Sequence, residues 1–305
     1  MKTAADPVRQ SPPDRLHYAT GELLGADDFV VEQTYHRRQL AQALLFLHGR
    51  GSVAGLKVQI APSPDPKDAT QLTEVQLQVQ PGLALDGAGR LVEVPRPACL
   101  RLRRWFEFVA NQPANSQADV MERGRLRAAW RADAAFDGGG AVVADVFLTF
   151  HPCERGYTPA FASGPFDALD ASQPSRVRDA YELSLVLRQN GEELLPAFDP
   201  WSAVQGGTPE ERLASARNAS LTAWDDLAKF SGDAAEDAHG IPPGVDRTAV
   251  LLARVKLPAS APPDDVTQPP GALWTAAAWA QPEIIDNQVR NFVLPTAALR
   301  RLAGL

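Results

Sequence analysis

The sequence predicts an α+β protein: a mainly antiparallel β-sheet or sandwich with a long N-terminal amphipathic helix and a second helix in mid-chain. Two observations favour this class. Apolar residues first recur with the period of a helix and then alternate as in strands. Tight glycine turns separate several of these short alternating segments. The pattern also lacks the regular strand–helix alternation that is typical of a parallel α/β sheet.

The first predicted element is a helix from about Ala26 to Leu47. Gly25 can serve as its N-cap, and Asp27 and Asp28 suit the positive end of the helix dipole. One broad face is apolar and could pack on the chain's own sheet or against copies of the helix. We expect the former, because the helix is too short for a sustained heptad seam. The residues of this face are Phe29, His36, Leu40, Ala43, Leu44 and Leu47.

Short strands follow the glycines that end this helix. A tight turn at Asp86–Gly89 divides them, and the run AVVADVFLTF has the composition of a buried strand. The segment 105–109 fits either a strand or a helix. Tyr181–Leu187 is predicted to be a strand, although 177–187 also fits a helix, and 152–174 is expected to be irregular. The predicted strands are Leu56–Ile60, Val75–Val79, Leu91–Val94, Cys99–Leu102, Ala141–Phe150, Val250–Leu257 and Asn291–Leu294.

A second helix is predicted from Thr208 to about Phe230, because Thr208, Pro209 and Glu211 form a capping box with proline at the first helical position. It is expected to bury Leu213, Leu221 and Trp224, with Leu227 as a further candidate, and a short final helix should cover Ala297–Leu302. We expect a flexible arm over residues 1–15 and a helix plus antiparallel β domain over 16–195. Residues 196–305 should form a helix plus late strands, which can return to the same sheet.

Composition narrows the class of protein. A net charge of −7 disfavours nucleic-acid binding, which usually needs a basic excess. The N-terminus lacks the apolar region of a secretion signal, and no apolar run is long enough to span a membrane. Cys99 and Cys153 are expected to be reduced thiols. These features predict a cytoplasmic protein that does not insert into membranes.

Catalytic signatures are weak. The glycines of His48–Gly55 end a helix and open a strand, which is the reverse of a phosphate-binding loop. The five histidines (His17, His36, His48, His151 and His239) show no metal-ligand spacing. We therefore expect no catalytic, cofactor-binding or metal-binding residues. A thiol or hydrolytic enzyme based on Cys153 with His151 or His239 is the weakest alternative, and a carbohydrate or cell-surface ligand module that uses Trp274 and Trp279 is the stronger one.

Two segments carry a distinctive combination of residues, and a third is a weaker example. The first segment contains Tyr18, Gly21, Leu23, Leu24, Asp27, Asp28, Phe29, Glu32, Gln33, Tyr35 and His36, and continues with Leu47, His48, Gly49, Gly51, Val53, Gly55 and Leu56. The second runs from Val79 to Asp86 and adds Gly89 and Arg90. The third is Ile285-Asp286-Asn287 with Arg290.

Together these segments resemble an uncharacterised bacterial family that is associated with contractile injection systems and phage-tail-like particles. The resemblance implies a non-enzymatic structural component, at the periphery of the baseplate or as an adaptor for fibres. Its expected partners are copies of itself or other tail and baseplate proteins. The residues expected to make such contacts are Phe29, His36, Leu40, Leu44, Leu47, Trp274 and Trp279.

Overall fold

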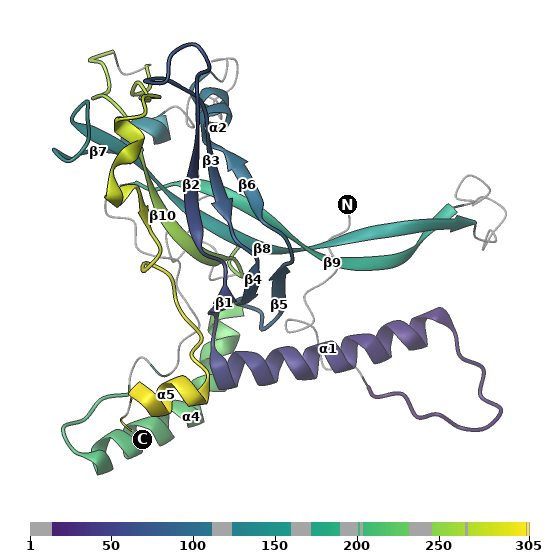
Figure 1. Cartoon of the computed structure of the whole chain (residues 1–305). Helices are drawn as coiled ribbons and strands as arrows, with labels where there is room; N and C mark the ends of the chain where they lie inside the picture. Colours follow the sequence, from purple (N-terminus) through teal and green to yellow (C-terminus); the bar gives the residue numbers. More distant parts are fainter. Residues whose placement is uncertain are drawn as a thin grey trace.

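The computed structural model describes residues 14–111, 124–159, 172–189, 201, 204–231, 246–265, 268–302 and 304. It confirms the α+β class, since helices accompany sheets in which the described strand pairs are antiparallel. Most of the predicted N-terminal arm lies outside the described residues. Figure 1 shows the strands gathered in the body of the molecule, with helices α1, α4 and α5 at one end of it.

Helix α1 (Ala26–His48) begins and ends through its own local chemistry. The Asp28 carboxylate accepts a hydrogen bond from the Gly25 N–H at 2.7 Å. This bond satisfies a backbone donor that the first turn would otherwise leave free. At the other end, Gly49 adopts a φ of 70°, and its N–H donates to the Leu45 carbonyl at 2.8 Å.

Helix α2 (Leu102–Ala110) covers the segment 105–109, which fitted either a strand or a helix in the sequence. It buries Leu102, Phe106 and Val109 at helical spacing.

Two three-stranded sheets follow α1. The first sheet has the order β1 (Gly51–Gly55), β4 (Gly82–Leu85) and β5 (Leu91–Val94). The second has the order β2 (Val58–Pro64), β3 (Leu72–Val79) and β6 (Ala98–Arg101).

A larger sheet contains most of the remaining strands. The segment 177–187 belongs to strand β9 of this sheet. Strand β10 pairs with β8, so the late strands return to the same sheet as strands from the first half of the chain. The sheet has the order β11-β10-β8-β7, with β9 also paired to β8. Its strands are β7 (Trp130–Ala132), β8 (Gly140–Pro159), β9 (Ser172–Leu187), β10 (Val250–Pro258) and β11 (Ile285–Asp286).

One apolar core joins these sheets. Leu77 of β3, Leu148 of β8 and Leu252 of β10 are all fully buried in the same hydrophobic cluster. Two short 3-10 helices, η3 (Ala278–Ala280) and η4 (Pro282–Ile284), contribute further residues to it. Side chains from distant parts of the sequence therefore share one core, whose burial is the main source of folding free energy.

Two strand predictions are wrong. Residues 152–174 were expected to be irregular, yet β8 continues to Pro159 and β9 starts at Ser172, while residues 160–171 lie outside the described part of the chain. A proline lacks the N–H that a ladder needs, but in a two-stranded ribbon each strand has an open edge where none is required. The segment 291–294 forms only an isolated bridge between Phe292 and Ser52, followed by helix α5 (Thr296–Leu302).

The β4–β5 turn touches α1 so closely that only glycine fits at its tip. Gly89 has a φ of 80°, and a β-carbon there would overlap the backbone of Ala41. We expect Gly89→Ala to lower the free energy of unfolding by about 3 kcal/mol, since a clash adds to the left-handed backbone strain. Gly139→Ala is the control: its φ is 82° but the space around it is open. It should cost only about 1 kcal/mol, as urea unfolding will measure. Equal losses would contradict the close contact.

Candidate interaction surface

Helix α1 exposes the apolar face that the sequence singled out. Phe29, Leu40 and Leu47 are 48%, 56% and 75% exposed, and His36 is exposed beside them. Leu44 is half-buried. The expectation that this face packs on the chain's own sheet is therefore wrong for all but Leu44.

The buried face of α1 is a neighbouring stripe, formed by Arg38, Ala41 and Leu45. Its position follows from the close approach of the β4–β5 turn: Gly89 can reach the α1 backbone only where the helix carries a small side chain, and Ala41 provides one. Apolar spacing alone does not distinguish these two stripes, since both contain residues at helical intervals.

Helix α4 (Pro209–Ser231) also leaves its large apolar side chains exposed. The capping box is present, because the Thr208 hydroxyl accepts from the Glu211 N–H and the Glu211 carboxylate accepts from the Thr208 N–H. Leu213, Leu221 and Trp224, however, are exposed rather than buried, and that prediction is wrong.

Small side chains replace them in the contact. The buried residues of α4 are Ala219 and Ala223, which allow its backbone to approach a neighbour closely. The Trp224 ring stacks on Phe46 of α1 with centroids 5.7 Å apart, which connects the two helices. Leu227 was the further candidate, and its side chain lies outside the described residues.

Helix α5 lies at the same end of the molecule (Figure 1). It buries none of its residues, and Leu299 and Leu302 are exposed. We call the exposed apolar side chains of the three helices the helical surface: Phe29, Leu40, Leu47, Leu213, Leu221, Trp224, Leu299 and Leu302.

Strands β8 and β9 extend from the sheet as a two-stranded arm, which Figure 1 shows projecting sideways from the body. Their pairing continues from Ala144–Leu187 in the sheet to Pro159–Ser172 at the outer end. In the outer part the described side chains are exposed, including Tyr157 on one face and Val177 on the other. The arm therefore offers two open backbone edges and an apolar side chain on each face.

A groove of about 200 Å³ lies between α1, the β4–β5 turn and the base of the arm. Leu40 and Leu44 line it from α1, and Leu91 and Phe150 line it from the strands. Because Leu40 also belongs to the helical surface, the groove continues that surface onto the body of the molecule.

The β4–β5 turn is held by a buried carboxylate. Asp86 is fully buried and accepts hydrogen bonds from the N–H groups of Ala88 and Arg90 at 2.9 and 2.8 Å. The Arg90 guanidinium forms an ion pair with it at 2.7 Å. Burial raises the pKa of Asp86, while Arg90 and the backbone donors oppose that rise.

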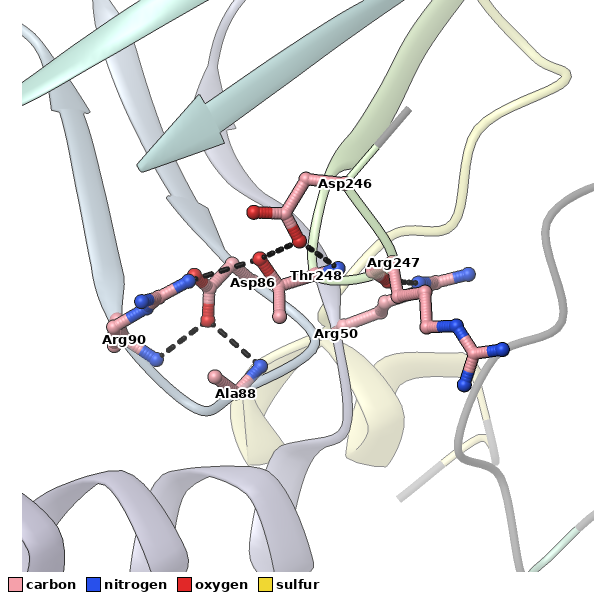
Figure 2. Close-up of polar contacts among 7 residues, drawn as sticks. All are labelled: Arg50, Asp86, Ala88, Arg90, Asp246, Arg247 and Thr248. Atoms are coloured by element: carbon pink, nitrogen blue, oxygen red, sulfur yellow. Dashed lines mark hydrogen bonds and ion pairs between the residues drawn. The ribbon is translucent and has the colours of Figure 1, made fainter. Parts of the chain in front are cut away.

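The same network reaches two other parts of the chain, as Figure 2 shows. Arg90 donates to the Thr248 hydroxyl at 2.9 Å, and that hydroxyl donates to Asp246 at 2.7 Å. Arg50, just after α1, donates to the Arg247 carbonyl at 3.0 Å. Burial lowers the pKa of Arg50 to about 10, and the charge of Asp86 opposes that fall. The network therefore connects the end of α1, the turn and the start of β10.

A second buried arginine closes the C-terminal segment onto β1. Arg290 donates to the carbonyl of Leu56 at 2.8 Å and to the hydroxyl of Ser52 at 3.3 Å, and it also bonds the Asn287 side chain. Burial lowers the pKa of Arg290 to about 10. Asn287 in turn exchanges two hydrogen bonds with the backbone of Val58. Asn287 and Arg290 therefore have a structural role. The sequence around them does not indicate that their partners are β1 and β2.

Trp274 and Trp279 lie together but do not form an open aromatic platform. Their rings stack with centroids 5.5 Å apart, and Phe106 meets Trp274 edge-on. Trp279 is 6% exposed, and its indole N–H donates to the Leu273 carbonyl at 2.7 Å. The pair therefore covers the core beside α2, far in the fold from the α1 residues with which it was grouped.

His151 and Cys153 lie on the same strand, where the arm leaves the sheet. The Cys153 thiol contacts the backbone carbonyl of His151 at 3.9 Å rather than its imidazole. Among the described residues, no group of three His, Cys, Asp or Glu side chains is placed to hold a metal ion. His239 lies outside the described residues.

Within the described part of the chain, no helix has the length and apolar character needed to cross a membrane. No protein-family model matches the sequence, and no curated protein matches it either.

The Asp86–Arg90 pair should contribute strongly to stability. Asp86→Ala leaves the Arg90 guanidinium and two backbone donors without their acceptor, so we expect a loss of about 3–5 kcal/mol in the free energy of unfolding. Glu107→Ala is the matched control. It breaks the Arg103–Glu107 pair, which has the same four-residue spacing and a similar length of 2.9 Å but is exposed.

Breaking this exposed pair should cost about 0.5 kcal/mol or less. Chemical unfolding of both variants gives the comparison. A similar small loss in both would show that the Asp86 carboxylate does not hold the turn.

Proposed function

We propose that this chain is a non-enzymatic structural component of a contractile, phage-tail-like particle, at the periphery of the baseplate or as an adaptor for fibres. The observation that carries the proposal is the helical surface: large apolar side chains on three helices stay exposed although the sheets already share a filled core. Exposed apolar surface on this scale is typical of proteins that bury it against a partner.

The arm supports the same role. A ribbon with two open edges can accept a further strand from a partner, and Tyr157 and Val177 can add apolar contacts on either face. Projecting ribbons of this kind extend the reach of a protein beyond its own core. Both features suit a component whose task is to hold neighbouring proteins.

The motifs behind the family resemblance have architectural roles in this fold. Asp86, Gly89 and Arg90 seat the turn on α1, and Asn287 and Arg290 attach the C-terminal segment to β1 and β2. Motif residues that serve packing and buried hydrogen bonding favour a structural family over a catalytic one. The carbohydrate-binding alternative is weakened, because Trp279 is buried and cannot stack on a sugar.

Particle assembly tests the proposal directly. We expect that deleting the chain from the producing cell yields incomplete or unstable particles in electron micrographs, and that the chain sediments with complete particles. Tyr157→Ser with Val177→Ser should weaken the association with particles about tenfold, the equivalent of about 1.4 kcal/mol, and so reduce the sedimenting fraction. Glu154→Gln, an exposed change on the same arm, is the control and should have no effect.

Two results would contradict the proposal. Normal particles without the chain would remove the assembly role, and a chain that remains in the supernatant when particles are sedimented would remove the particle association. Thermal unfolding of the double variant should match that of the parent chain, because both side chains lie outside the core.

A further inference from the structure

Six residues of α1 form a regular line along the helix. They are separated alternately by four and three residues, which is the spacing of the a and d positions of a coiled coil. Every one of them is exposed. We call this line the seam: Phe29, Gln33, His36, Leu40, Ala43 and Leu47.

The seam runs along most of α1. It covers 19 of the 23 residues of α1, and Phe29 and Leu47 lie about 27 Å apart along the helix at 1.5 Å per residue. Because each pair of successive intervals adds up to seven residues, the seam keeps one orientation toward a helix that coils around it. A partner helix could therefore contact the seam over its whole length.

The body of the molecule leaves the seam accessible. Ala41 and Leu45 face the sheets, and Gly89 holds that side of α1 against the β4–β5 turn. The seam residues Leu40 and Leu47 lie outside this buried stripe and are exposed by more than half, and Leu40 also lines the groove beside the β4–β5 turn. The large apolar side chains of the seam therefore remain accessible to a partner, although Glu32 beside the seam also contacts Tyr18 of its own chain.

We propose that the seam pairs with the seam of a second copy of this chain, as a short parallel coiled coil. The charges beside it identify the partner and the direction. Glu32 precedes the seam residue Gln33, and Arg37 follows the seam residue His36. These are the g and e positions, and in a parallel pair a g residue faces the e residue five positions further along the other helix.

Parallel pairing therefore brings Glu32 of each copy opposite Arg37 of the other, which makes two ion pairs between the chains. Antiparallel pairing would instead bring Arg37 beside its own counterpart and Glu32 beside the apolar Phe46. Like charges at that position oppose association. The polar Gln33 at an a position also disfavours slipped registers, since its amide would then face an apolar residue.

The dimer would serve the proposed role in particle assembly, and only its purpose rests on that proposed function. Purified chain tests it without any particle, so the two can fail independently. A short seam makes a small interface, for which affinities in the micromolar range are expected. Light scattering over a range of protein concentrations should therefore show a mass that rises from one copy to two.

The double substitution Leu40→Glu with Leu47→Glu places charges in the seam and should keep the chain monomeric at all concentrations. Leu213→Glu with Leu221→Glu makes the same change on the exposed face of α4 and should leave the dimer intact. Circular dichroism and thermal unfolding of both variants must match the parent chain. A monomeric parent chain, or a seam variant that still dimerises, would overturn the proposal.

Charge reversal tests the ion pairs. Glu32→Arg alone and Arg37→Glu alone should each weaken dimerisation about tenfold. In a dimer of either variant, residues 32 and 37 carry the same charge, so both pairs between the chains become repulsive. Mixing the two variants should restore association as a mixed dimer, since every facing pair is then opposite in charge. If Glu32→Arg leaves dimerisation unchanged, the proposed parallel arrangement is wrong.

Cysteine cross-linking fixes the direction of the helices, in a background with Cys99→Ser and Cys153→Ser. Gln33→Cys should form a disulfide between copies under mild oxidation, because parallel pairing places each Gln33 beside its counterpart. Gln39→Cys is also exposed on α1 but lies away from its counterpart in a parallel pair. In an antiparallel pair the two results would be exchanged, and that outcome would overturn the proposal.

Discussion

The contact between the β4–β5 turn and α1 determines which face of α1 is buried and which is left exposed to solvent. Asp86 holds the turn through its ion pair with Arg90, and Gly89 then meets the α1 backbone at Ala41. This contact selects which stripe of α1 is buried. Because the stripe containing Ala41 faces the sheets, the larger apolar residues of α1 face outward, and the surface that we assign to assembly is a consequence of that choice.

Small residues decide the packing of the helices more than large ones do. Ala41 in α1 and Ala219 and Ala223 in α4 are buried, whereas Leu47 and Leu221 remain in solvent. A small side chain allows two backbones to approach, and the larger ones on either side are then too far from the core to be covered. The large apolar side chains therefore remain free for contacts outside the chain. The core does not need them, because strands β3, β8 and β10 already fill it.

Much of the fold could be predicted from local patterns. The alternation over Val75–Val79 and the capping box at Thr208 each specify their element through neighbouring residues, and both are present in the structure. The prediction failed where long-range contacts decide. Nothing near Leu213 shows that α4 buries alanines instead, and nothing near Arg290 shows that its partners are Ser52 and Leu56. The apolar face of α1 was found from its spacing, but its exposure depends on Gly89, some fifty residues along the chain.

The attachment of Arg290 to β1 has a consequence for synthesis. Its hydrogen bonds to Ser52 and Leu56 connect residues 238 and 234 positions apart, and Asn287 reaches Val58 across 229. A ribosome must therefore synthesise the long intervening chain before β1 and β2 receive these partners. Until then the carbonyl of Leu56 has no guanidinium to accept from, and an interrupted product would carry an incompletely bonded strand beside the end of α1. Closure by Arg290 therefore comes long after β1 and β2 have been synthesised.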